Sequence, residues 1–270
     1  MLPLTRKPLG DEVYSILRRM IIRRDLQPGS RITENEIAES LGVSRTPVRE
    51  AFQRLAYDEL LILQPGRSPQ VRPITLHSVD EAYPLIAVLE GLAIRLACRR
   101  LTETDLRHME DLTGEMERCG RAGDTESLMR ADNDFHGVLH ERAANSRLHG
   151  VVADLRKRLE RLEFVFFSTP AAVKGSVKRH RWLVKVLRKR DPREAQKALE
   201  YTWGVGQQLV RQLVADLQAA SVAHGERSEA LAVSVRPNFE ATGRKRQGLM
   251  MRQTATGNGG FNSPIRLGGV

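Results

Sequence analysis

The chain has 270 residues, 41% of them hydrophobic and 28% charged, and a formal net charge of +10 at pH 7. This length and composition are typical of a soluble globular protein with room for two cores. The longest apolar tract, residues 85–97, is interrupted by Glu90 and Arg95, which excludes a membrane span of ~20 apolar residues. No charged-then-apolar leader opens the chain and two cysteines make no disulfide framework, so we expect a cytoplasmic protein. A single bridge between Cys98 and Cys119 stays open.

The first part of the chain predicts two short helices. Residues 11–27 carry apolar side chains three and four apart, including Val13, Leu17 and Ile21, and Pro28-Gly29 then ends the helix. The stretch RITENEIAESLG has Thr33 and Glu36 at the spacing of a capping box, and Gly42 suits the left-handed turn that follows a short helix.

A third helix is predicted from Ser44, which suits an N-cap, and Pro47 is tolerated in the first turn. Residues 60–64 and 70–74 then read as two short strands around the loop PGRSP. A basic loop between two strands beside three helices is a wing. The segment as a whole predicts a winged helix-turn-helix, whose third helix enters the DNA major groove.

Arg45 and Arg49 lie four residues apart, opposite the apolar face of Val48, Phe52 and Leu55. We therefore expect both guanidinium groups on the surface, where they can pair with guanine or phosphate. Ser44 and Thr46 can donate to phosphates at the same helix start. An alternative stays open for each residue taken alone, because arginines on a helix surface and capping hydroxyls are common in proteins that bind no DNA.

Residues 9–75 resemble the DNA-binding domain of the GntR superfamily. The stretch RITENEIAESLGVSRTPVREAFQRL, followed by ELLI, closely follows that family's pattern. The resemblance implies contacts with double-stranded DNA from a set of seven residues: Asn35, Ser44, Arg45, Thr46, Arg49, Gly66 and Arg67. Asn35 departs from the Arg that some members carry at its position.

Residues 78–220 predict six antiparallel helices joined by short turns. Their ranges are 78–100, 103–121, 124–143, 146–167, 171–189 and 192–220. Each has apolar residues three and four apart, for example Leu85, Val88, Leu89 and Leu92 in the first. Such a bundle builds ligand sites from side chains that project inward. The predicted fold class is therefore mainly α, with an N-terminal winged helix-turn-helix and a C-terminal six-helix bundle.

Asp132 and His136 lie one turn apart on one face of the third bundle helix. A carboxylate and an imidazole at this spacing can chelate a divalent metal, and a hydrogen-bonded Asp-His pair without metal is the alternative. His140, one turn further, either extends this face or lies on the surface.

The bundle resembles the FCD effector domain of FadR-type regulators. The similar stretches are DNDFHGVLHERAANSRL and RHRWLVKVLRKRDPREAQKAL, and six helices imply the VanR-like branch. The resemblance implies a divalent metal such as zinc on Asp132, His136 and His180, and a small-molecule effector, often a carboxylate. The family's fourth ligand is replaced by Thr202, and Ile86 stands where many members carry an effector-binding Arg.

Together these features predict a ligand-responsive, DNA-binding transcriptional regulator, a homodimer and not an enzyme, with repression relieved by the effector. One alternative is a constitutive regulator with a degenerate sensor. A remote alternative is a metal-dependent hydrolase, although no base, nucleophile or oxyanion donor accompanies the ligands. Residues 221–270 lack a periodic apolar face and predict a disordered tail.

Overall fold

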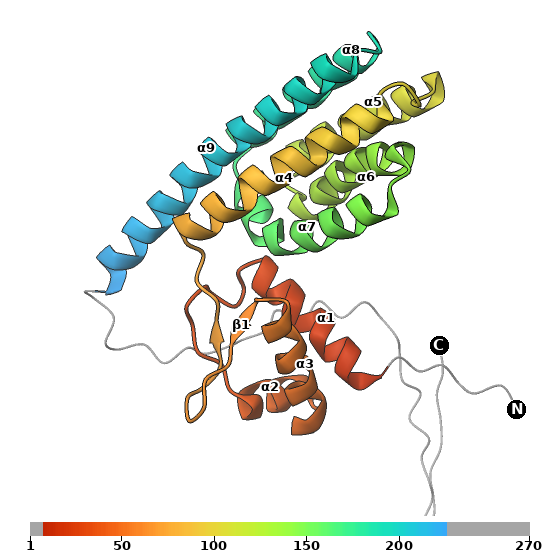
Figure 1. Cartoon of the computed structure of the whole chain (residues 1–270). Coiled ribbons are helices and arrows are strands. Elements are labelled where there is room, and N and C mark those ends of the chain that lie inside the picture. The colour runs from red at the N-terminus through yellow and green to blue at the C-terminus, as the bar shows by residue number, and fades with distance from the viewer. Residues whose placement is uncertain (1–7, 226–270) are drawn as a thin grey trace, which may run out of the picture. The chain divides into compact units, whose positions relative to one another are not determined.

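Nine helices and one short hairpin make up residues 8–225, the part of the chain that the computed structural model describes (Figure 1). Its side chains are described for residues 8–219. The expected mainly α class, with an N-terminal winged helix-turn-helix and a helical C-terminal domain, is confirmed. None of the described helices is long and apolar enough to cross a membrane.

The N-terminal domain packs three helices around one apolar core. They are α1 (Leu9–Ile22), α2 (Glu34–Leu41) and α3 (Arg45–Tyr57). The expected inward faces are buried, with Leu17, Val48 and Leu55 fully excluded from solvent. This burial of apolar side chains, rather than the intrinsic helix preference of such short segments, holds the three helices together.

The turn between α2 and α3 forms as its sequence predicts. The Thr33 side chain accepts a hydrogen bond from the Glu36 backbone amide, and the Glu36 carboxylate accepts one from the Thr33 backbone amide, which completes the capping box. Gly42 has a φ of 64°, the left-handed conformation that glycine adopts at least cost. Ser44 differs from the expectation, because its side chain makes no capping hydrogen bond. Its hydroxyl is exposed at the start of α3.

The wing consists of β1 (Leu61–Ile62) and β2 (Gln70–Val71), paired antiparallel with Leu61 opposite Val71. These strands are shorter than the predicted five residues each. The loop between them contains two prolines, which donate no backbone hydrogen bond, and Gly66 at a φ of 71°. Pairing therefore stops after two residues, and the loop tip lies on the surface.

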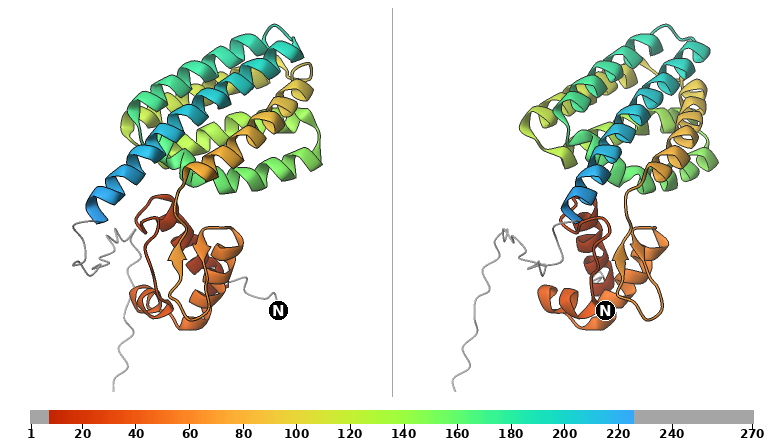
Figure 2. Two further views of the ribbon diagram at one scale, coloured as in Figure 1. Left: turned by 60° about the vertical axis from the view of Figure 1, so that its left-hand side comes forward. Right: turned by 90° about the vertical axis from the view of Figure 1, so that its left-hand side faces the viewer.

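Six helices form the C-terminal domain, and Figure 2 shows them from two sides. Their bounds are α4 (Leu76–Ala97), α5 (Glu103–Ala122), α6 (Thr125–Ala143), α7 (Ser146–Phe167), α8 (Pro170–Leu187) and α9 (Pro192–Gly225). The predicted helix starts agree closely, because Thr102, Asp124 and Asn145 cap α5, α6 and α7 through their side chains. Helix α9 continues past Ser221, where the tail was expected to begin, as far as Gly225. Residues 226–270 lie outside the described part.

The apolar stripe that the sequence indicated on α4 does not face the core. Leu85 is 58% exposed and Val88 is 63% exposed, whereas Val79, Ile86 and Ile94 are fully buried. Helix α4 carries apolar residues on two faces, so periodicity alone could not tell which face packs against the other helices. The second apolar face is left on the surface of this chain.

Candidate functional site

The seven residues that the resemblance assigned to DNA contact are all exposed. Asn35 lies on α2, Gly66 and Arg67 lie at the wing tip, and the other four lie within residues 44–49, at the N-cap and start of α3. We name these four, Ser44, Arg45, Thr46 and Arg49, the reading face. Burial of Val48, Ala51 and Phe52 fixes the rotation of α3 and turns the reading face to solvent.

One carboxylate holds both arginines of the reading face. Arg49 donates two hydrogen bonds to Glu34, each 3.0 Å long, and Arg45 Nη2 lies 3.2 Å from Glu34 Oε2. The hydrogen bonds from Arg49, aided by Arg45, hold the pKa of Glu34 below its usual range. Arg45 and Arg49 nevertheless remain 59% and 58% exposed. Their guanidinium groups are therefore oriented but still open to a ligand.

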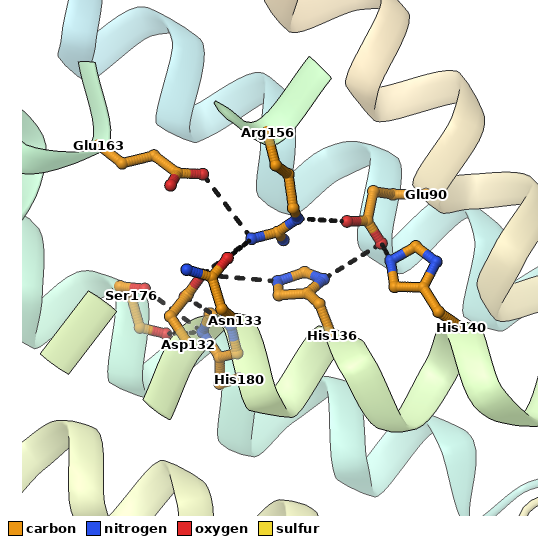
Figure 3. A network of polar contacts seen from close by, with 9 residues as sticks. All are labelled: Glu90, Asp132, Asn133, His136, His140, Arg156, Glu163, Ser176 and His180. Carbon is orange, nitrogen blue, oxygen red and sulfur yellow. Dashed lines mark hydrogen bonds and ion pairs between the residues drawn. The ribbon is translucent and has the colours of Figure 1, made fainter. Parts of the chain in front are cut away.

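A second polar site lies inside the bundle, where α4, α6, α7 and α8 meet (Figure 3). We name it the polar cluster, and it contains Glu90, Asp132, His136, His140, Arg156, Glu163 and His180. The structure brings together the three predicted metal ligands, whose donor atoms lie within 4.8 Å of one another. Asp132, His136 and His180 are each at most 5% exposed.

The hydrogen bonds around the two histidines leave one nitrogen of each ring free. His180 Nδ1 lies 2.9 Å from the Ser176 carbonyl oxygen, which can only accept, so Nδ1 carries the proton. His180 Nε2 then faces Asp132 Oδ1 at 3.2 Å, so it donates to this carboxylate when it is protonated and has no partner among the described residues when it is not. His136 Nδ1 contacts Glu90 at 3.3 Å in the same way, and its Nε2 points toward Asp132.

Charge in the polar cluster suits a cation between these atoms. Burial alone would raise the pKa of Asp132, but contacts with His180 and His136 lower it to about 2, so Asp132 is a carboxylate. Burial, together with the Arg156 guanidinium, lowers the pKa of His136, which keeps this ring neutral at pH 7. Two imidazole nitrogens and a carboxylate oxygen, each histidine held from behind by an oxygen, are the usual surroundings of a zinc ion.

Sequence reasoning missed three charged members of the polar cluster. Glu90 is fully buried on α4, and Arg156 on α7 donates to its Oε1 at 2.9 Å. His140, which the sequence left undecided, is buried with Nε2 3.2 Å from Glu90 Oε2. Burial raises the pKa of Glu163 to about 8, since Arg156 at 3.8 Å makes no hydrogen bond with it. The sequence marks Glu90 as unusual, because it is an acidic residue inside an apolar tract. Nothing in the sequence distinguishes Arg156 or Glu163 from surface residues.

The cavity beside the polar cluster is small. It measures about 50 Å³ and is lined by side chains that include Tyr83, Arg179, Thr202 and Trp203. Thr202 thus lies beside the cluster, where it donates to the Ala198 carbonyl at 3.0 Å. Organic ligands usually occupy about 300–1,000 Å³, so this cavity has room for a few water molecules or an ion and not for an organic effector as it stands.

Comparisons with known proteins agree with this architecture. Residues 9–71 match the family described as "Bacterial regulatory proteins, gntR family", and residues 81–203 match the "FCD domain". A probable D-xylose utilization operon transcriptional repressor of Paenarthrobacter nicotinovorans is 30% identical over 201 residues, 73% of this chain and 87% of that protein. The repressor RspR of Escherichia coli is 25% identical over 72% of this chain and 85% of its own length.

Among solved structures, E. coli McbR/YncC superposes with a TM-score of 0.63 at 24% identity. The match covers 77% of this chain and 99% of that one, which supports the fold. A putative GntR regulator from Rhodococcus gives the same TM-score at 22% identity, over 74% of this chain and 96% of that one. The chain therefore belongs to the gntR family of bacterial transcriptional regulators, with an FCD domain after its DNA-binding domain.

Proposed function

We propose that this regulator binds a DNA operator through the reading face and releases it when an effector binds the helical domain. The observation that carries the proposal is the exposure of Arg45 and Arg49, one turn apart at the start of α3, where Glu34 holds both. Arginine pairs well with guanine in the major groove, and the start of a helix adds a positive dipole end.

The other predicted contacts have supporting roles. Ser44 and Thr46 donate to phosphates at the edges of the groove, which sets the register of α3. Asn35 at the second helical position of α2 and Arg67 at the wing tip reach the flanking backbone, and Gly66 lets the wing approach closely. These contacts fix the position of the domain, while the two arginines of the reading face supply sequence choice.

The protein would act as a homodimer that presents two reading faces to a pseudo-palindromic operator. The exposed apolar stripe of α4, with Leu85, Val88 and Leu92, supports this assembly. We assign this stripe to contact with a second copy of the chain, because an operator of two half-sites requires two DNA-binding domains. Sedimentation of a Val88→Asp variant should give a monomer, whereas an unchanged dimer would place the interface elsewhere.

Asp132, His136 and His180 would hold a divalent metal such as zinc. The buried His180 Nε2 opposite Asp132 Oδ1 supports this fit, because a cation, either a proton or a metal ion, between these two atoms would join them. A bound metal supplies an open coordination position for an effector oxygen. Binding of the effector would repack the side chains around the 50 Å³ cavity. It would release the operator only if the effector binds the released conformation of the protein more tightly than the DNA-bound conformation.

The test begins with selection of bound fragments from random DNA. Operator affinity is then measured against metabolites and metals, with wild type beside an Asp132→Asn variant. The proposal expects at least one metabolite or metal to weaken wild-type binding and to leave the variant unaffected. An operator affinity that stays constant across a broad screen would refute gating while leaving DNA binding intact.

A second candidate is a constitutive regulator whose sensor has degenerated. Ile86, Thr202 and the small cavity favour it, because each removes an expected effector contact or the space for one. Metal analysis of protein purified without chelator discriminates between the two. A stoichiometric metal supports the sensor, and a metal-free protein with full operator affinity supports the constitutive regulator.

A further inference from the structure

A larger cleft lies apart from both sites, where the wing side of the N-terminal domain meets α4 and α7. It measures about 320 Å³. Its apolar lining includes Leu60, Ile74, Leu155 and Leu162, and its basic lining includes Arg72 and Arg161. We name it the arginine cleft. Its volume falls in the range of sites that take small organic molecules, unlike the cavity of the polar cluster.

Arg161 is buried and Arg72 is half-buried, and neither pairs with a carboxylate among the described residues. Arg161 is 7% exposed, and its Nη1 donates to the backbone carbonyl of Arg72 at 2.5 Å. The Nε atoms of Arg161 and Arg72 are buried and make no hydrogen bond with any described residue. Within residues 8–219, neither side chain has a carboxylate at ion-pair distance.

The carboxylates that line the cleft are engaged elsewhere. Glu59 pairs with Arg158, Asp58 accepts a hydrogen bond from Tyr14, and Glu81 lies 3.3 Å from His77 on the outside of α4. Each of these carboxylates has another polar partner, and none of them lies within ion-pair distance of Arg161 or Arg72.

Such an arrangement is costly unless something fills it. Burial, with the nearby Arg72, lowers the pKa of Arg161 to about 10, which shows how poorly this cation is solvated. The buried Arg156 of the polar cluster differs, because Glu90 pairs with it. An unpaired buried cation is rare in proteins, which normally pair such groups or bind an ion there.

We propose that the arginine cleft binds a small organic oxyanion with an apolar body, whose charged end pairs with Arg161 and Arg72. The oxyanion is a carboxylate or a phosphate monoester, since arginine binds both through parallel N–H donors. The apolar body covers Leu155 and Leu162. The site is independent of the polar cluster and of the metal proposed there. Its ligand contacts both domains at once, because Arg72 follows β2 and Arg161 lies on α7.

The experiment uses fluorine-observed NMR on the full chain with three probes. They are 4-fluorobenzoate, 4-fluorophenyl phosphate and the uncharged 4-fluorobenzyl alcohol. We expect at least one anion to bind with a dissociation constant below about 1 mM, and the alcohol to bind at least tenfold more weakly. Comparison of the two anions identifies the preferred oxyanion.

Variants locate the bound probe. Arg161→Met keeps an apolar side chain about as long as the aliphatic part of arginine and removes the guanidinium group, so binding of the anion should fall about tenfold or more. Asp132→Asn in the polar cluster and Arg107→Met at an exposed position on α5 should leave it unchanged. The anion should raise the melting temperature of wild type and not that of Arg161→Met. The Arg161→Met protein should itself melt no lower than wild type, because it loses an unpaired charge.

Several results would overturn the proposal. One is the absence of anion binding at millimolar concentration, and another is loss of binding in Asp132→Asn rather than in Arg161→Met. If Arg161→Met instead dissociated a dimer by sedimentation, a carboxylate of a second copy would be the counterion. None of these outcomes bears on operator binding by the reading face, so the two proposals fail separately.

Discussion

The reading face and the polar cluster handle charge in opposite ways. Arg45 and Arg49 share one carboxylate at the surface and remain more than half exposed. Arg156 is 11% exposed and is committed to Glu90 inside the bundle. Ion pairs at the surface contribute little to stability, whereas a buried pair that loses one partner destabilises strongly. The first arrangement is suited to exchanging its partner for DNA, and the second to holding a fixed geometry.

This difference predicts that substitutions separate into two classes. Changes in the reading face should alter DNA binding and leave folding intact. Changes in the polar cluster should first alter stability, and operator affinity only through the conformation of the bundle. Four substitutions test this division, from the largest expected effect to the smallest.

Arg156→Met should destabilise the protein by about 3–5 kcal/mol, because Glu90 is left as a buried charge without the guanidinium that donates to it at 2.9 Å. Urea unfolding monitored by circular dichroism measures the effect. Arg158→Met is the matched control, since Arg158 lies on the same helix but is half exposed. Its expected cost is about 0–1 kcal/mol. Equal effects for the two variants would show that the polar cluster contributes no more than the surface.

Glu163→Gln should change how stability depends on pH. Burial raises the pKa of Glu163 to about 8, so between pH 5 and 8 the folded state binds a proton that the unfolded state has released. The contribution of Glu163 to the free energy of unfolding of the wild type therefore falls by roughly 3 kcal/mol as the pH rises over this range. The free energy of unfolding of the variant, relative to that of the wild type, should therefore increase toward pH 8.

The exposed Glu141→Gln on α6 is the control for losing one carboxylate. Its difference from wild type should stay nearly constant over the same pH range. If the stability difference between Glu163→Gln and wild type were also independent of pH, Arg156 would be keeping Glu163 ionised in the folded protein.

Arg49→Ala should lower affinity for the selected operator by about 1–3 kcal/mol, with the unfolding free energy nearly unchanged. Fluorescence anisotropy at fixed salt measures the affinity. Arg107→Ala, an exposed position on α5, controls for loss of one positive charge. If both variants bound the operator like wild type, Arg49 would make no contact that matters.

Glu34→Gln should have the smallest effect. Its carboxylate competes with phosphate for both arginines, so affinity for random DNA should rise by less than about tenfold. The ratio of operator to random affinity should fall, because the arginines lose the group that orients them. A lower affinity for random DNA would mean that Glu34 serves only to position the arginines.

Local features of the fold could be predicted from the sequence because they depend on neighbours in the chain. The capping box of Thr33 and Glu36, the left-handed Gly42 and the helix starts at Thr102 and Asn145 all formed as expected. Features that depend on packing between helices could not be predicted from the sequence in the same way. The stripe containing Val88 lies on the surface, since α4 has two apolar faces and only tertiary contacts choose between them.

The same distinction holds for the sites. The exposure of Arg45 and Arg49 followed from the inward face of α3, and Asp132 with His136 from a spacing of one turn. Arg156 and Glu163 could not be found, because each is one charged residue among several on α7 until the partners from other helices are known. Arg161 looked like any basic surface residue, and only its burial without a carboxylate sets it apart.

The most direct test of the central claim, that the reading face contacts operator bases, is photo-crosslinking from position 46. A benzoylphenylalanine replaces Thr46, which is exposed between the two arginines in the first turn of α3. The account predicts crosslinks to bases inside each half-site of the selected operator, and none from the same group at position 107 on α5. Crosslinking from position 107 but not from position 46 would contradict it.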